Sequence, residues 1–133
     1  MKMTVSQAIL AAEAIASMRN KALPVRASYA LGKSFTALAK ERQTVDEERM
    51  KLCRMYAEKD ENGEPVVDGN VFKMTTENEA ACNAEYAKLL ATETEVDVCQ
   101  VPITLLEAAD QDKRYDSLTI RELDAISMLI TEE

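Results

Sequence analysis

Apolar residues recur every three or four positions through the first half of the chain, the period of an α-helix buried on one side. Thr4 and Gln7 have the identities and spacing of a capping box, so we expect a first helix to begin at Thr4. That helix should end by Leu23, because the residue before a proline disfavours helical geometry. Pro24 suits the first turn of a second helix. The pattern therefore predicts an N-terminal helical hairpin.

The second helix is predicted to be long, because no proline occurs between Pro24 and Pro65. Its contact line alternates spacings of four and three residues, as in a coiled coil, and comprises Leu31, Phe35, Leu38, Arg42, Val45, Arg49, Leu52 and Tyr56. Arg42 and Arg49 interrupt the apolar line. We expect each to lay its stem over apolar neighbours or to pair with a carboxylate from the acidic half of the chain. Thr44 opens a second capping box, which leaves a break open, but we favour one continuous helix.

The middle of the chain changes from a helical pattern to turn signals. Asp68-Gly69 is a turn dipeptide, and the short apolar runs on either side of it predict a small β-hairpin. A capping box opening at Thr76 predicts a further helix to about Ala91. We expect that helix to bury Cys82, Tyr86, Leu89 and Leu90.

The last third predicts one strand and two helices. Residues 93–98 alternate polar and apolar, as in a half-buried strand, and Pro102 marks a strand end or edge. A short helix should start at Thr104. A capping box at Thr119, with a hydrophobic staple around it, predicts a terminal helix that extends over Ile130.

These elements predict a helix-dominated α+β fold: an N-terminal helical hairpin with one long helix, a small β-hairpin, one further strand and a C-terminal helix. The chain has 133 residues, which fits a single domain, 1–133. An odd number of cysteines without a C-x-x-C motif argues against a disulfide framework. No signal peptide or membrane-length apolar segment is found, so we expect a soluble protein of the cytoplasm with no membrane contact.

Charge divides the chain into two halves. The net charge is −8, yet residues 1–57 form a basic helical half of +5 and residues 58–133 an acidic α+β half of −13. Such asymmetry favours packing between the halves or head-to-tail contacts between copies of the chain. An ordinary solvated surface of uneven charge is the alternative.

The residue types exclude several chemistries. The chain has no histidine, which removes Ser-His and Cys-His nucleophiles and His-ligated metals, and its three glycines form no phosphate loop. Glu93, Glu95 and Asp97 would lie about 7 Å apart along one strand face, where they could hold a divalent cation. A solvated strand face is the favoured interpretation. We therefore predict no catalytic residue, no metal and no cofactor.

Basic side chains spaced by multiples of seven residues predict a ridge along one side of the long helix, made of Arg26, Lys33, Lys40 and Arg54. The candidates for binding a partner are Arg26, Lys33, Lys40, Arg42, Arg49, Arg54, Glu93, Glu95 and Asp97. The ridge could contact phosphates or an acidic protein, and a plain solvated face is its alternative. Tyr29 and Phe35 are expected in the core, so base stacking and direct nucleic-acid binding are not predicted.

The order of features resembles that of a known family. The features are Leu23-Pro24-Val25 at the start of the long helix, the turn Lys59 to Gly63, a helix at Asn78-Glu79, an acidic strand from Thr94 to Val98, and a terminal helix from Leu118 to Ile130. In these the chain resembles a family of small uncharacterised proteins from phages and prophages of Gram-positive bacteria. The resemblance implies a phage origin and an accessory, assembly or host-interaction role.

Together these observations favour a non-enzymatic phage accessory protein that acts in the host cytoplasm by protein binding or assembly, as a homo-oligomer. The alternative is an inhibitor of host defence, either an acidic decoy for a nucleic-acid-binding effector or a sponge for a nucleotide signal. A carboxylate-dependent hydrolase is a weaker alternative.

Overall fold

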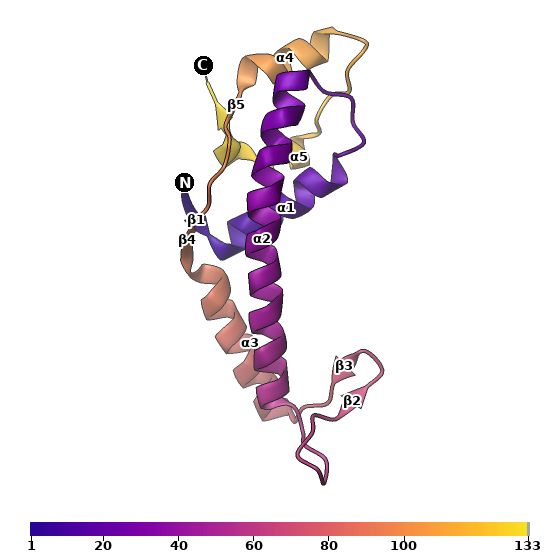
Figure 1. The fold of residues 1–133 in the computed structure, drawn as a ribbon, viewed down its shortest axis with the longest axis vertical. Coiled ribbons are helices and arrows are strands. Elements are labelled where there is room, and N and C mark those ends of the chain that lie inside the picture. Colours follow the sequence, from indigo (N-terminus) through magenta and orange to yellow (C-terminus); the bar gives the residue numbers. More distant parts are fainter. Residues whose placement is uncertain (133) are drawn as a thin grey trace. The chain divides into compact units, whose positions relative to one another are not determined.

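The computed structural model describes residues 1–132 and has the helix-dominated α+β fold that the sequence predicts (Figure 1). Its helices are α1 (Val5–Ser17), α2 (Val25–Tyr56), α3 (Thr76–Ala91), α4 (Ile103–Gln111), α5 (Ile120–Ala125) and the 3-10 turn η1 (Ser127–Leu129). Its strands are β1 (Lys2–Thr4), β2 (Val67–Asp68), β3 (Val71–Phe72), β4 (Glu93–Glu95), β5 (Val101–Pro102) and β6 (Ile130–Thr131). They pair as β1–β4 and β2–β3, both antiparallel, and β5–β6, parallel.

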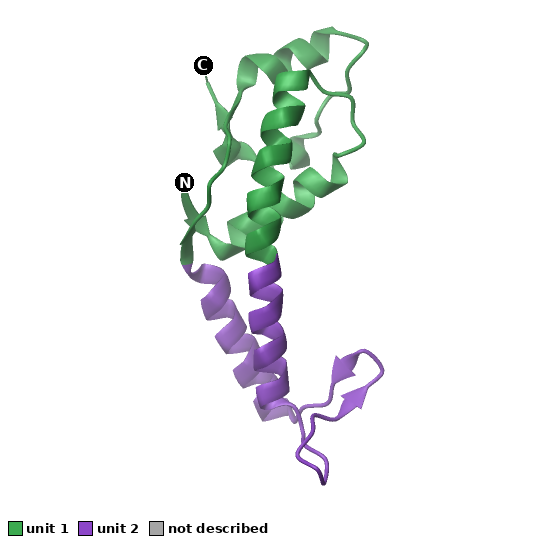
Figure 2. Cartoon of the chain, viewed as in Figure 1, with its two compact units in different colours: residues 1–42, 93–133 green, residues 43–92 purple. Residues whose placement is uncertain are grey.

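The chain divides into two compact units (Figure 2). Unit 1 joins residues 1–42 to the residues from 93 onward, and unit 2 comprises residues 43–92. The boundary falls inside α2, which continues past Thr44 without a break. The charge boundary drawn after residue 57 lies inside unit 2, so the basic and acidic halves of the sequence do not coincide with the units.

Unit 1 instead brings together two segments of opposite charge. Residues 1–42 carry seven Lys or Arg against two Asp or Glu, and residues 93–133 carry three against eleven. Ion pairs between side chains join the two segments. Lys2 lies 3.8 Å from Glu93, and Lys21 lies 2.7 Å from Glu122.

The core of unit 1 is built on a small-residue face of α1. Ala8, Ala11, Ala12 and Ile15 recur at helical spacing and are buried, so α1 can pack closely against its neighbours. The capping box predicted at Thr4 is present: the backbone N–H of Gln7 donates to Thr4 Oγ1 over 3.1 Å.

One buried polar side chain connects α2 to the segment before β5. Ser34 is fully buried, and its hydroxyl donates to the carbonyl of Cys99 over 2.9 Å and accepts from the Cys99 N–H over 2.8 Å. Both backbone groups of Cys99, a half-buried residue, are thereby paired. This contact was not predicted from the sequence.

The terminal helix is shorter than predicted. Its capping box at Thr119 is present, but α5 ends at Ala125 and Ile130 belongs to β6, paired with Val101. Ile126 and Leu129 are both fully buried across the intervening 3-10 turn. Because a 3-10 turn aligns residues three apart, it buries both side chains on one side.

Two other boundaries also differ from the prediction. The N-cap of α3 is Thr75 rather than Thr76, and its hydroxyl accepts from the N–H of Asn78. The predicted strand over residues 93–98 is limited to β4, and its partner β1 was not predicted. Pro102 ends β5, as expected.

Unit 2 contains the second part of α2, the hairpin β2–β3 and α3. The predicted hairpin is confirmed, with Val67 opposite Phe72 and Asp68 opposite Val71. Its two-residue loop is Gly69-Asn70, and Gly69 has a φ of 66°, the left-handed value that a type II′ turn requires of its first central residue.

Candidate functional site

A groove of about 270 Å³ lies in unit 1 between the end of α1 and the first turns of α2. It is lined by Ile15, Met18, Arg19, Lys21, Leu23, Ser28, Leu31, Gly32, Phe35 and Thr36. Ligand pockets in proteins start at about 300 Å³, so the groove has room for one or two side chains of a binding partner. Its wall combines aliphatic and aromatic carbon with two cations.

The two cations of the groove differ in what holds them. Lys21 is engaged within the chain: its ammonium lies 2.7 Å from a Glu122 carboxylate oxygen and donates to the carbonyl of Ser117. The guanidinium of Arg19 lies 5.1 Å from the ring centroid of Phe35 and makes no ion pair with the described residues. Stacking orients the guanidinium while leaving its N–H donors available for a carboxylate.

The surroundings of Glu122 lower the pKa of its carboxyl group. Partial burial acts to raise the pKa of this carboxyl, but hydrogen bonds from Lys21 and Thr119 outweigh it and hold the pKa below its ordinary value. Glu122 is therefore ionised in the folded chain at neutral pH, and it keeps Lys21 in place at the edge of the groove.

Gly32 exposes the backbone of α2 where it borders the groove. A Cβ placed on Gly32 would meet nothing within 4 Å, so no contact within the chain requires a glycine there. Glycine in a helix interior is less stable than alanine by about 1 kcal/mol. The position is therefore suited to close approach by another molecule.

The outer side of α2 beside the groove carries exposed apolar residues. Val25 is 81% exposed and Tyr29 is 67% exposed, and they lie one helical turn apart. The ammonium of Lys33 lies 5.6 Å from the ring centroid of Tyr29. We name Arg19, Val25, Arg26, Tyr29 and Lys33, which lie on this side of α2 and on the adjoining wall of the groove, the basic face.

The expectation that Tyr29 is a core residue is wrong, whereas Phe35 is half-buried against the core. The buried side of α2 in unit 1 passes through Ala27, Leu31, Ser34 and Leu38. Tyr29 is two residues from Ala27 and from Leu31, which places it on the opposite side of the helix. Its position off the apolar line was the signal that could have identified it.

The predicted ridge of cations is divided between the two units. Arg26, Lys33 and Lys40 are exposed in unit 1. In unit 2, Arg54 is exposed. Arg49, which the sequence placed in the contact line of the long helix and not in the ridge, lies with its guanidinium 5.1 Å from the ring centroid of Tyr86.

Arg42 pairs with a residue that the sequence did not indicate. Its guanidinium lies 3.5 Å from the carboxylate of Glu13, on α1. Of the two alternatives expected for Arg42, pairing with a carboxylate of the acidic half is therefore wrong. The partner of Arg42, Glu13, lies in unit 1 and belongs to the basic half of the sequence.

The acidic strand face is occupied by cations of the chain. Glu95 lies 3.0 Å from the amino group of Met1, Glu93 is paired with Lys2 across the β1–β4 ladder, and Asp97 is exposed beyond the strand. Among residues 1–132 no three His, Cys, Asp or Glu side chains are placed to hold a metal ion.

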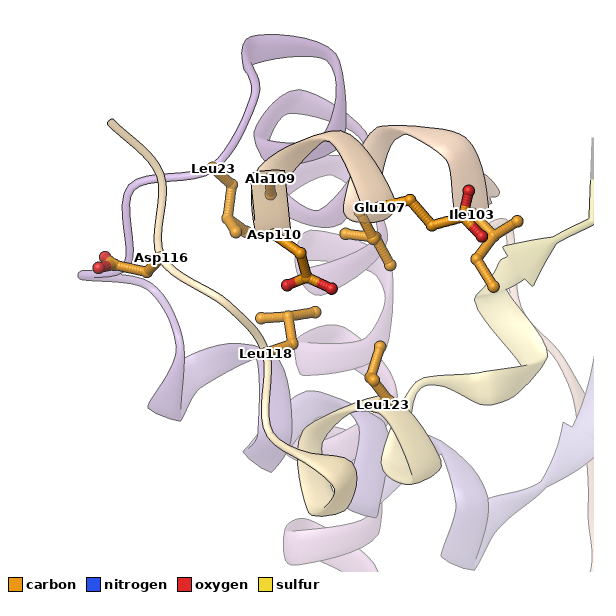
Figure 3. A pocket seen from close by; sticks show the side chains of 9 residues that line it. Leu23, Ile103, Glu107, Ala109, Asp110, Asp116, Leu118 and Leu123 are labelled. Carbon is orange, nitrogen blue, oxygen red and sulfur yellow. The ribbon is translucent and has the colours of Figure 1, made fainter. Parts of the chain in front are cut away.

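A second, smaller pocket of about 110 Å³ lies in the C-terminal part of unit 1, with apolar side chains on its wall (Figure 3). Figure 3 shows the Asp110 carboxylate directed toward Leu118. Glu107 and Asp110, one turn apart on α4, are exposed, and their carboxylates form no hydrogen bond or ion pair with the described part of the chain. We name these two carboxylates the acidic rim.

Two other carboxylates near this pocket, those of Asp112 and Asp116, are already engaged. Asp116 accepts from the N–H of Ala22, and its own N–H donates to the Ala22 carbonyl, each over 2.7 Å. Hydrogen bonds from Arg114 lower the pKa of Asp112 to about 2. The acidic rim thus differs from Asp112 and Asp116, whose carboxylates are paired within the chain.

In residues 1–132, no helix combines the length and apolar character needed to cross a membrane. Comparisons of the chain with protein-family models, with curated proteins and with solved structures found no match.

Proposed function

We propose that the protein is a non-enzymatic binding protein that assembles with copies of itself, the basic face of one copy binding the acidic rim of the next. The observation that carries this proposal is the exposed Tyr29 between the cations Arg26 and Lys33. An aromatic side chain flanked by cations is typical of the centre of a protein interface, where tyrosine and arginine are enriched. The phage accessory role implied by the family resemblance, in a host cytoplasm, is the context in which we place this assembly.

Charge supports a second copy as the occupant of the basic face. The chain is acidic overall, with a net charge of −8, so a separate acidic region of the same chain is available to meet a local basic surface. Glu107 and Asp110 provide two carboxylates without an internal partner, beside an apolar pocket that can receive a side chain such as Tyr29. The match is between different surfaces of the two copies, which generates rings or open chains rather than a symmetric dimer.

Sedimentation velocity over a range of concentrations tests the proposal. We expect reversible association at low ionic strength that weakens as salt rises, because exposed charges farther apart than about 10 Å are screened at 0.1 M salt. Tyr29→Ala should weaken association on the order of tenfold, since an interface hot spot contributes more than about 1 kcal/mol. A wild-type chain that stays monomeric at the highest concentration and the lowest salt would overturn the proposal.

Two lysine variants with the same charge change distinguish a specific role of the basic face from an effect of net charge. Lys33→Glu should weaken association, whereas Lys113→Glu makes the same charge change at an exposed lysine outside the basic face and should not weaken it. Equal losses for the two variants would contradict a specific role for the basic face.

Mixing two defective variants tests the head-to-tail arrangement. Tyr29→Ala damages only the basic face, and the double variant Glu107→Gln with Asp110→Asn damages only the acidic rim. Each alone should remain largely monomeric, and a mixture should form 1:1 dimers through the one intact pair of surfaces. A mixture that sediments as the two separate monomers would exclude this arrangement.

A further inference from the structure

Two helical segments of unit 2 lie side by side in antiparallel register, the second part of α2 and α3 (Figure 1). The Arg49 guanidinium stacks on the ring of Tyr86, and farther along the pair the side-chain amide of Asn78 donates to the carbonyl of Tyr56 over 3.2 Å. As the residue number rises on one helix it falls on the other. These two contacts fix which residues of the helices face each other.

Between these contacts a cysteine of each helix meets a cysteine of the other. Cys53 lies one helical turn beyond Arg49 and Cys82 lies one turn before Tyr86, so the register of the two helices places the two cysteines opposite each other. Cys82 is buried, and Cys53 is half-buried. The two thiols come from opposite helices and differ in access to solvent.

We propose that Cys53 and Cys82 form a thiol modification site that closes to a disulfide by exchange with a small-molecule disulfide of the glutathione type. The inference concerns unit 2 alone, so it is independent of the self-assembly proposed for unit 1. It assigns to these cysteines a reaction that their sequence spacing did not suggest.

The exchange takes place in two balanced steps. The Cys53 thiolate attacks one sulfur of the small disulfide, forming a mixed disulfide and releasing one small thiol after protonation. The Cys82 thiolate then attacks the Cys53 sulfur, forming the Cys53–Cys82 bond and releasing the second small thiol. The protein loses two hydrogen atoms in all, and the small disulfide gains them.

Solvent access decides which thiol reacts first. Cys53 is partly open to a reagent, whereas Cys82 is covered within the helix pair. Burial, together with the nearby Cys53 thiol, raises the pKa of the Cys82 thiol above its ordinary value, and Arg49 partly opposes the shift. Cys82 is therefore the resolving thiol, which acts once the mixed disulfide has formed beside it.

Incubation of the folded full-length chain with oxidised and reduced glutathione, followed by acid quenching, alkylation and peptide mass mapping, tests the site. We expect a product lighter than the reduced chain by two hydrogen atoms, with Cys53 joined to Cys82 and Cys99 alkylated. The closed loop should raise the melting temperature, because it restricts the unfolded chain.

Three variants, each with one cysteine replaced by serine, make the test specific. Cys99→Ser should form the same disulfide as the wild type, Cys82→Ser should accumulate glutathione on residue 53, and Cys53→Ser should form neither product. Circular dichroism confirms that each variant is folded before it is assayed. The proposal would be overturned if Cys53–Cys82 formed only after denaturation, or if Cys99 were the cysteine that reacted in the folded chain.

Discussion

Replacing Gly32 by alanine should stabilise the protein, although glycine is usually kept where a side chain does not fit. Gly32 lies within α2, has no left-handed φ, and a Cβ there would meet no atom within 4 Å. The new methyl group therefore causes no clash, and the helix gains the better intrinsic propensity of alanine. The expected gain in the free energy of unfolding is about 1 kcal/mol.

The same substitution should have the opposite sign at the other two glycines. Cβ atoms on Gly63 and Gly69 would also meet nothing within 4 Å, but their φ values are 78° and 66°. Alanine in the left-handed region is strained, so Gly63→Ala and Gly69→Ala should each lower the free energy of unfolding by about 1 kcal/mol. All three positions are open, and only the backbone conformation distinguishes them.

Urea denaturation followed by circular dichroism measures all three variants against the wild type. For a chain of 133 residues, 1 kcal/mol corresponds to a shift in melting temperature of about 4 °C, which a thermal scan resolves. Destabilisation by Gly32→Ala, or stabilisation by either of the other two variants, would show that backbone conformation does not set the sign of these effects. Since Gly32 borders the groove, Gly32→Ala should also weaken self-association while it stabilises the single copy.

Three further predictions concern unit 1. Ser34→Ala should cost about 1–2 kcal/mol in urea denaturation, because it leaves both part-buried backbone groups of Cys99 without their partner in the chain. The lowered pKa of Glu122 stabilises the fold above the unfolded-state value of about 4.3 and loses that contribution as pH falls through the folded-state pKa. Glu122→Gln, which also removes the ion pair with Lys21, should therefore reduce the stability difference between pH 7 and pH 3. Thr119→Ala should cost about 1 kcal/mol through loss of its N-cap, and no loss in thermal unfolding would contradict that role.

Features that depend only on neighbouring residues could be predicted from the sequence. The capping boxes at Thr4 and Thr119 join atoms three residues apart, so their identities and spacing were sufficient to place both helix starts. The hairpin turn at Gly69 and the long helix after Pro24 follow from the same local rules. The helix-dominated α+β class could also be predicted, because the apolar periodicity of helices and strands involves residues that are close in sequence.

Which distant residues lie together depends on the tertiary structure. Three examples are Lys2 opposite Glu95 in the β1–β4 ladder, Ser34 bonded to Cys99, and Cys53 opposite Cys82 in the register of α2 and α3. Such contacts depend on how whole elements pack, and a local pattern does not record that packing.

The candidate site shows the same division. The sequence indicated the cations of α2, but not the groove beside them, because the groove forms only where α1 and α2 meet. It also placed Tyr29 in the core, and only the packed helix showed that the buried side passes through Ala27 and Leu31 instead. The local pattern established that α2 would be an amphipathic helix, and packing free energy summed over distant residues decided which of its sides faces solvent.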